Sequence, residues 1–203
     1  MGAGPLEEVD PLIDPDRPPQ PIRAFFALPL PDAQRQALSG HLSECAARAP
    51  SFRWVSADNL HLTMRFLGRV DRDVALRVGR RLAAHVLPAP RLELSGLGTF
   101  KRGRLVRVVW AGLRSGADAA AALAAVVESE CAAAGIESEA RPFAPHLTLA
   151  RARERDGAAL PDLPPMPGLE PWTAKELVLF QSHLSPRGAR YEPLAGVRLG
   201  ASD

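Results

Sequence analysis

Two four-residue stretches, His61-Leu62-Thr63-Met64 and His146-Leu147-Thr148-Leu149, are the most informative part of this sequence. Each contains a His-x-Thr element, and the second histidine follows the first by 85 residues. The chain has only five histidines, and half of its few threonines stand two residues after one of them. Random placement would produce a His-x-Thr element about 0.1 times in a chain of this composition. The repeat therefore indicates an internal duplication.

The spacing within each stretch is typical of a β-strand. Side chains of a strand alternate between its two faces, so His61 and Thr63 share one face while Leu62 and Met64 point into a core. The second stretch repeats this arrangement with its own histidine and threonine. If the two stretches belong to two similar lobes, the four polar side chains face each other across a cleft.

The rest of the chain alternates between helix and strand patterns, but a helix does not follow every strand. This argues against a regular parallel βαβ array, and we predict an α+β fold with mainly antiparallel sheets. Helices are expected at about residues 32–48, 71–86 and 116–134. Strands are expected at about residues 22–28, 60–67, 91–98, 104–111, 145–150, 176–183 and 190–197.

The charge balance excludes some classes of protein. The 203 residues carry 25 Lys and Arg against 23 Asp and Glu, a net charge of +2, which fits neither a histone-like polycation nor an acidic solvating protein. Residues 1–20 are rich in proline and contain five acidic residues but one arginine, so we predict a disordered acidic leader there. Residues 21–203 form one domain, in which 152–171 is a long surface connection.

Nothing in the sequence predicts a membrane or secretory segment. No apolar run reaches the roughly 18–20 residues that span a bilayer, and the N-terminus lacks the apolar region of a secretory signal. Cys45 and Cys131 lie in alanine-rich, helix-like sequence and are too few for a disulfide framework, so we interpret them as reduced thiols. We expect a cytoplasmic monomer without a membrane partner.

Two histidines beside two hydroxyls suit acid–base chemistry on a phosphate ester. Histidine is the side chain whose ordinary pKa allows one imidazole to be neutral and another to be protonated near neutral pH. Threonine hydroxyls can donate hydrogen bonds to the non-bridging oxygens of a phosphate. In a cyclic phosphate ester, one histidine would take a proton from water and the other would give one to the leaving sugar oxygen. This scheme requires no metal.

Three other interpretations of the histidines remain open. A metal site would favour His-x-His, His-x-x-x-His or a nearby carboxylate, and neither element has a carboxylate within two residues. A Ser-His-Asp hydrolase would need a nucleophile elbow, which the sequence lacks. Ordinary edge-strand histidines would explain one such element better than two matched ones.

The surroundings of the two elements resemble a known family. The duplicated His-x-Thr-x element is the signature of the 2H phosphoesterase superfamily, and the longer stretches are similar to the bacterial RNA 2′,3′-cyclic phosphodiesterases, also called 2′-5′ RNA ligases. The resemblance covers residues 22–195, with no departure at the four signature positions. It rests on Arg23–Leu28 (RAFFAL), Trp54–Gly68 (WVSADNLHLTMRFLG), Arg141–Arg151 (RPFAPHLTLAR) and Arg187–Leu194 (RGARYEPL).

The resemblance implies a bilobal fold, in which two sheets with flanking helices surround a pseudo-two-fold central cleft. It implies hydrolysis of RNA 2′,3′-cyclic phosphate ends to 2′-phosphomonoesters without metal or cofactor, and a reversible 2′-5′ ligation of tRNA halves. It also implies that His61 is the proton donor to the departing 3′ oxygen. By the same resemblance, His146 is the proton acceptor that activates water, and Thr63 and Thr148 bind the phosphate.

Two arginines are further candidates for binding the phosphate. Arg65 continues the face of His61 and Thr63. Arg151 closes the second stretch, where simple alternation puts it opposite Thr148, although alternation fails at strand ends. Aromatic residues that could stack an RNA base, or belong to the core, are Phe25, Phe26, Trp54 and Phe143. Tyr191, the only tyrosine, is a candidate for lining the cleft.

Two other functions stay open besides the RNA phosphodiesterase. One is an enzyme of the same superfamily that opens cyclic phosphates on small nucleotides. The other is a nucleotide- or RNA-binding module whose motifs hold phosphate without turnover. The remaining histidines, His41, His85 and His183, are expected to have structural roles.

Overall fold

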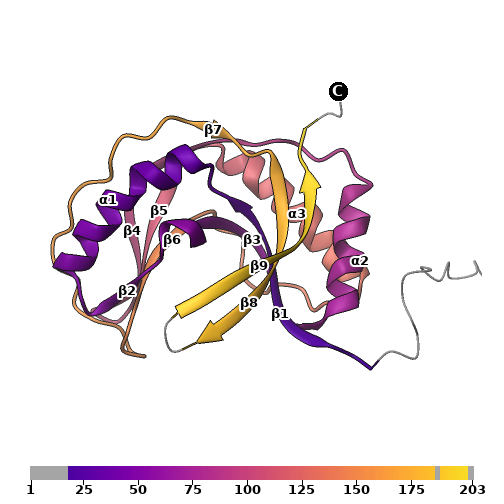
Figure 1. Cartoon of the computed structure of the whole chain (residues 1–203), viewed down its shortest axis with the longest axis horizontal. Helices are drawn as coiled ribbons and strands as arrows, with labels where there is room; N and C mark the ends of the chain where they lie inside the picture. The colour runs from indigo at the N-terminus through magenta and orange to yellow at the C-terminus, as the bar shows by residue number, and fades with distance from the viewer. Residues whose placement is uncertain (1–17, 186–187, 201–203) are drawn as a thin grey trace, which may run out of the picture.

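Within residues 18–185 and 188–200, which the computed structural model describes, nine strands form one curled sheet flanked by helices (Figure 1). The order is β7-β4-β5-β6-β3-β1-β8-β9, β2 pairs with β6, and every strand pair is antiparallel. The strands are β1 Pro21–Pro29, β2 Phe52–Trp54, β3 His61–Asp71, β4 Arg91–Arg102, β5 Leu105–Ser115, β6 Leu147–Ala152, β7 Trp172–Thr173, β8 Glu176–Ser185 and β9 Gly188–Arg198.

The described chain also contains three α-helices and one 3-10 turn, which are α1 Asp32–Arg48, α2 Arg72–Ala83, α3 Ala117–Ala133 and η1 Ala57–Asn59. This confirms the predicted α+β class and each predicted helix and strand. The sequence patterns missed β2, β7 and η1 because two or three residues are too few to show a hydrophobic period. None of these helices combines the length and the apolar character needed to cross a bilayer. Residues 1–17 of the predicted leader lie outside the described residues.

The two sheets expected from the resemblance are joined at one point. Among the residues that the structure describes, Leu62 of β3 and Leu147 of β6 form the one strand pair that links them. On one side of this pair the sheet continues through β5, β4 and β7, and on the other side through β1, β8 and β9. The molecule therefore consists of two halves that meet at the two His-x-Thr elements.

The two halves repeat one chain path. β1, α1 and β3 follow one another in the first half, as β5, α3 and β6 do in the second. α1 and α3 both have 17 residues, and the distance from Asp32 to Ala117, like that from His61 to His146, is 85 residues. The duplication that the short elements indicated thus extends through the helices.

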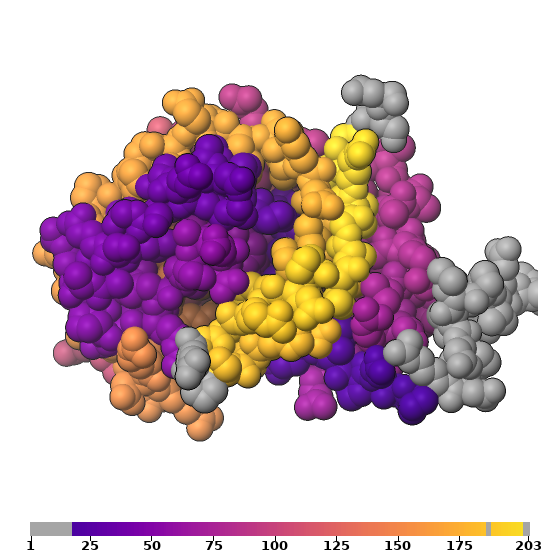
Figure 2. Space-filling view, in the orientation of Figure 1, coloured from indigo at the N-terminus to yellow at the C-terminus, as the bar shows by residue number. Residues whose placement is uncertain are grey.

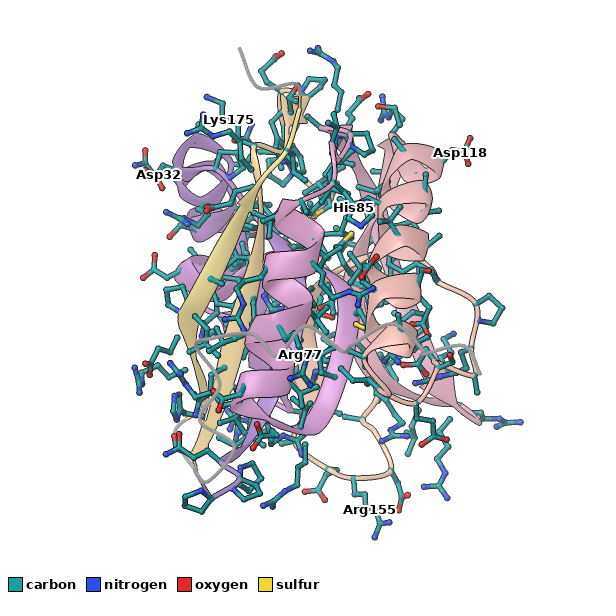
Figure 3. The ribbon with its side chains drawn as sticks, turned by 90° about the vertical axis from the view of Figure 1, so that its right-hand side faces the viewer. Asp32, Arg77, His85, Asp118, Arg155 and Lys175 are labelled. Atoms are coloured by element: carbon teal, nitrogen blue, oxygen red, sulfur yellow. The ribbon has the colours of Figure 1, made fainter. Side chains whose placement is uncertain are left out.

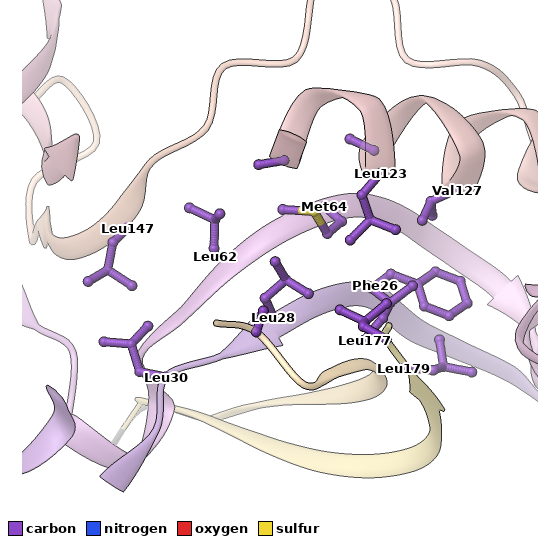
Figure 4. Close-up of a cluster of buried hydrophobic side chains, with 14 of the residues drawn as sticks. Phe26, Leu28, Leu30, Leu62, Met64, Leu123, Val127, Leu147, Leu177 and Leu179 are labelled. Carbon is purple, nitrogen blue, oxygen red and sulfur yellow. The ribbon is translucent and has the colours of Figure 1, made fainter. Parts of the chain in front are cut away.

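The apolar faces of both halves form a shared core. Leu62 and Leu147 are 2% and 0% exposed, and α3 lies across β3 and β1 with Leu123 and Val127 pointing down onto them (Figure 4). Burying one leucine stabilises the fold by about 1.5–3 kcal/mol. A one-residue slip of either strand would exchange these leucines for a histidine and a threonine. The core therefore determines the face on which both His-x-Thr elements lie.

The β8–β9 hairpin covers part of that polar face in the first half. β8 pairs with β1, and the ring of Tyr191 in β9 lies 5.1 Å from that of His61. The amide nitrogen Nδ2 of Asn59 in η1 donates to the carbonyl of Ala189 at 2.9 Å, which ties the hairpin to the segment before β3. Figure 2 shows the surface hollowed beside this hairpin.

Candidate active site

The link between the halves brings the four predicted polar residues together. The pair that joins β3 to β6 is antiparallel, and continuing its register puts His61 opposite Thr148 and Thr63 opposite His146. Because side chains alternate along a strand, all four lie on the face away from the linking leucines. Directly opposed residues have Cβ atoms about 4.5–5.5 Å apart, so we expect each imidazole to stand near a hydroxyl of the other half.

Each imidazole is held in the same way. Nδ1 of His61 lies 2.7 Å from the carbonyl oxygen of Asn59, and Nδ1 of His146 lies 2.7 Å from that of Ala144. A carbonyl oxygen only accepts, so we assign the proton to Nδ1 in both rings. Nε2 is then the atom that can exchange a proton with a bound molecule. The acceptor stands two residues before the histidine in both cases, which extends the repeat to the backbone.

His61 is surrounded by aromatic rings. The ring centroids of Phe25 and Tyr191 lie 4.9 and 5.1 Å from that of His61. Burial lowers the pKa of His61 from 6.5 to about 4; the hydrogen bond at Nδ1 opposes this, and the positive charges of Arg151 and His146 add to it. In the free protein His61 is therefore neutral at neutral pH.

His146 lies beside an aromatic residue that is more exposed to solvent than those beside His61. Its ring centroid lies 5.0 Å from that of Phe100 and 6.2 Å from that of Trp110, and Phe100 is 41% exposed. The indole of Trp110 lies across Gly98 of β4, where a Cβ atom would collide with it. The glycine therefore allows this indole to lie against the sheet beside His146.

Arg65 does not lie where alternation along β3 predicts. The pairing with β1 shifts register between Thr63 and Arg65, and this β-bulge turns the arginine toward the helix-covered face. The side chain is 7% exposed, forms an ion pair with Glu128 of α3 and donates to the carbonyl of Glu137. The expectation that Arg65 shares a face with His61 and Thr63 is wrong, and its guanidinium is engaged away from the proposed phosphate site.

A bulge in β6 has the opposite consequence for Arg151. The pairing with β5 shifts register between Thr148 and Ala150, so Arg151 returns to the face of Thr148 instead of lying opposite to it. Its positive charge acts on both His61 and Tyr191, where it opposes the rise that burial causes in the pKa of the tyrosine. The structure therefore brings Arg151 to the site, and the bulge is the physical reason.

Phe66 is the counterpart of Arg151 in the first half. It stands 85 residues earlier in the chain, is 52% exposed, and its ring lies 5.8 Å from that of Phe25, which also contacts His61. The 85-residue offset was the signal that could have identified it. The sequence patterns also missed Phe100, Trp110 and Phe180, which reach the site through strand pairings that they do not reveal.

The aromatic candidates for base stacking, and Tyr191 as the candidate for lining the cleft, have different positions. Phe25 and Tyr191 lie against His61. Phe26 is fully buried in the core, Trp54 donates its indole N–H to a main-chain carbonyl, and Phe143 packs against the core from the segment before β6.

The other three histidines lie outside the site. His41 is buried in α1, and His85 lies between α2 and α3, where its Nε2 is 3.0 Å from the carboxylate of Glu130 (Figure 3). His183 of β8 pairs with Glu192 of β9. In the described part of the chain, no three His, Cys, Asp or Glu side chains are close enough to hold a metal ion.

The chain is similar to known proteins over both of its halves. Residues 28–110 and 113–191 match the family model described as "LigT like Phosphoesterase", and both His-x-Thr elements fall inside the match. An Escherichia coli K12 protein named RNA 2′,3′-cyclic phosphodiesterase is 35% identical over 179 residues, which are 86% of this chain and 95% of that protein. A Geobacillus stearothermophilus protein of the same name is 32% identical over 88% of this chain, but the chain spans only 58% of its length.

A solved structure has the same fold. The structure of E. coli LigT complexed with 3′-AMP matches with a TM-score of 0.73 and 31% identity, covering 89% of this chain and 99% of that one. The fold and the paired His-x-Thr elements define an α+β protein of the two-histidine, or 2H, phosphoesterase class. Within that class, the chain belongs to the LigT-like phosphoesterase family.

Proposed function

We propose that this protein hydrolyses the 2′,3′-cyclic phosphate ends of RNA to 2′-phosphomonoesters, with its two histidines as acid and base and without a metal. The observation that carries the proposal is the matched pair of imidazoles, each tethered through Nδ1 and each next to the Leu62–Leu147 pair that joins the two halves. The E. coli and Geobacillus relatives bear the name of this activity, which supports the choice of substrate.

In the proposed reaction, Nε2 of His146 takes a proton from water as the water oxygen attacks phosphorus. The bond from phosphorus to the 3′ oxygen breaks, and Nε2 of His61 gives its proton to that oxygen. The phosphate stays on the 2′ oxygen. One proton enters His146 as another leaves His61, so the pair exchanges a proton with solvent before the next turnover. Positioned proton transfer of this kind contributes about 10²–10⁴-fold.

The phosphate is proposed to lie between the two elements. The hydroxyls of Thr63 and Thr148 donate to its non-bridging oxygens, and Arg151 adds a charge-assisted hydrogen bond, a kind worth about 1.5–3 kcal/mol. Arg65 has no part in this binding because its guanidinium is bound to Glu128 on the other face.

The pKa of His61 has to rise before its imidazole can hold the proton that it donates. Burial and nearby positive charge disfavour its imidazolium form in the free protein. A bound phosphate places negative charge between the two histidines, and an opposite charge at this range favours the protonated form. We therefore propose that substrate binding protonates His61.

The same site accounts for a reversible 2′-5′ ligation. A 5′-hydroxyl of a second RNA takes the place of water, while the attacked phosphorus, the broken bond and the proton donor stay the same. The product is a 2′-5′ phosphodiester, and tRNA fragments are the proposed substrates. Both histidines come from one chain, so a monomer completes the site.

The test is mass analysis of an RNA oligonucleotide with a 2′,3′-cyclic phosphate end after incubation with the protein in excess EDTA. We expect the gain of one water and a phosphate that maps to the 2′ oxygen. The variants His61→Ala and His146→Ala, checked for folding by circular dichroism, should lose this activity.

Other outcomes select the alternatives. Activity lost in EDTA and restored by zinc would indicate a metal site, and a 3′-phosphate product would overturn the assignment of the leaving group. Faster hydrolysis of adenosine 2′,3′-cyclic phosphate than of the oligonucleotide would indicate a small-nucleotide enzyme. A tightly bound ligand recovered unchanged would indicate a binding module.

A further inference from the structure

One strand edge is covered in the second half and open in the first. The short strand β2, Phe52–Trp54, pairs with residues 150–152 of β6. The 85-residue offset makes residues 65–67 of β3 the equivalent edge and residues 137–139 the equivalent of β2. In the described part of the chain, Arg65 and Phe66 pair with β1 on their other edge, and residues 65–67 have no strand on this one.

The two segments differ because of their side chains. β2 reads Phe-Arg-Trp, and burial of Phe52, which is 1% exposed, holds the segment on the sheet. The equivalent segment reads Glu-Ser-Glu and is exposed throughout, since it has no apolar side chain to bury. Arg65 spans the resulting gap with its side chain and donates to the carbonyl of Glu137, where backbone hydrogen bonds close the gap in the other half.

A cavity of about 690 Å³ lies in this gap. One wall is residues 65–70 of β3 with Val74 of α2, and the other is residues 134–140 after α3. Its volume falls within the roughly 300–1,000 Å³ of small-molecule sites. Phe66 lines the cavity, and its ring lies 5.8 Å from that of Phe25, which contacts His61, so these two rings connect the cavity with the surroundings of the proposed reaction site.

The charges around the cavity nearly balance, which suits an uncharged nucleobase better than a second phosphate. The walls carry two cations, Arg65 and Arg69, and two carboxylates, Glu137 and Glu139, and Arg65 lies 4.0 Å from Glu139. The carbonyl of Phe66 already accepts a hydrogen bond from Arg65. The carboxylates and the remaining main-chain groups can bond the amino, N–H and acceptor groups of an unstacked base. Phe66 offers a ring for stacking.

The distance along β3 assigns this base to one nucleotide. At about 3.3 Å per residue, Leu67 lies roughly 13 Å beyond Thr63, and the cavity continues to Val70. A terminal nucleotide whose phosphate is held at Thr63 reaches the near end of the cavity at Phe66. The nucleotide before it is the one that extends inside.

We propose that the cavity between the open edge of β3 and residues 134–140 binds the base of the nucleotide that precedes the 2′,3′-cyclic end of an RNA. This inference rests on the proposed function and adds a preference for RNA ends over mononucleotides. Stacking of a single base on an aromatic side chain corresponds to a preference of about 5- to 150-fold.

The experiment compares kcat/KM for the dinucleotide ApA with a 2′,3′-cyclic end and for adenosine 2′,3′-cyclic phosphate. The wild-type protein should favour the dinucleotide by about 5- to 150-fold. Ala140→Trp fills the cavity from an exposed position, so it should abolish this preference and leave mononucleotide hydrolysis unchanged. Ser138→Trp on the same wall should act alike, and Ala122→Trp, on the exposed face of α3, should retain the full preference.

Equal kcat/KM values in the wild-type protein, or an undiminished preference in both cavity variants, would overturn the inference while hydrolysis itself stands. An equal loss for both substrates would place the terminal base in the cavity, which also overturns it. If neither substrate is hydrolysed, the proposed function fails, and equilibrium binding of ApA 2′-phosphate decides the inference. Binding tighter than that of adenosine 2′-phosphate, and weakened by Ala140→Trp, would support the cavity; equal binding would overturn it.

Discussion

The halves around His61 and His146 share their local structure and differ in what surrounds it. Both imidazoles bond through Nδ1 to a carbonyl two residues earlier. Phe25 beside His61 is 3% exposed, whereas Phe100 beside His146 is 41% exposed. The duplicated element thus sets the orientation of each imidazole, while residues from other strands determine how strongly it is desolvated.

The equivalent positions after the two bulges carry different side chains, one charged and one aromatic. The second half has Arg151 on the polar face, and the first half has Phe66 there. A cyclic phosphate at an RNA end is not symmetric, since it carries a base and a chain on one side only. Two identical halves could not distinguish its two ends, so the differences between the halves suit the proposed ligand.

Removing the imidazoles one at a time should have the largest effect. His61→Ala and His146→Ala should each lower the rate on a 2′,3′-cyclic end by about 10²–10⁴-fold. Sulfur in place of the bridging 3′ oxygen should restore much of the rate of His61→Ala, because a thiolate leaves without a proton. It should not restore His146→Ala. Single-turnover rates provide the measurement, and rescue of His146→Ala alone would reverse the assigned roles.

The next effect concerns the side chain that spans the open edge of the first half. Arg65→Met removes the cation paired with Glu128 and leaves that carboxylate only the main-chain N–H of Glu139 as a donor. Breaking a buried pair costs about 3–5 kcal/mol. Because Glu128 is partly exposed, we expect the free energy of unfolding to fall by about 3 kcal/mol in chemical denaturation. Arg102→Met removes an exposed pair with Asp156 and should change it by less than about 1 kcal/mol. Equal losses would mean that the buried network contributes no more than a surface pair.

The desolvation of His61 should appear in the pH dependence of stability. Its pKa falls from 6.5 to about 4 on folding, so between these values the unfolded chain binds a proton that the folded chain does not. The free energy of unfolding should therefore fall as the pH is lowered through this window, by at most about 3 kcal/mol, and this contribution is constant below it. His61→Gln should show a smaller fall in denaturant titrations. An identical fall in both proteins would show that His61 is not desolvated.

The smallest effect should come from a change at Gly98, beneath the indole beside His146. A Cβ atom in Gly98→Ala would collide with the indole of Trp110, and overpacking typically costs about 1–3 kcal/mol. We expect a loss near 1 kcal/mol, with a several-fold higher KM because the ring beside His146 must move. Gly96→Ala, whose Cβ would meet no atom within 4 Å, is the matched control. Unchanged KM and tryptophan fluorescence in Gly98→Ala would show that this indole does not shape the site.

Hydrophobic periodicity predicts some features of the two halves and not others. The helices, the strands and the shared face of His61 and Thr63 follow from periodicity, which is local. The predicted face of Arg65 was wrong because the direction of its side chain depends on a bulge in the pairing of β3 with β1. Strands that pair are distant in the chain, so a local pattern does not show such a bulge. The same cause hid Phe66, although the 85-residue offset from Arg151 was present in the sequence.

The amino-acid sequence alone determined the duplication, the α+β class and the polar residues that stand over a leucine core, because strand alternation and apolar burial act within a few residues. Only the tertiary structure decided which arginine reaches the site, how His61 is desolvated and which strand edge stays open. Those features depend on where two strands bulge and which side chains from distant segments cover them. Such contacts form only when segments far apart in the chain pack together.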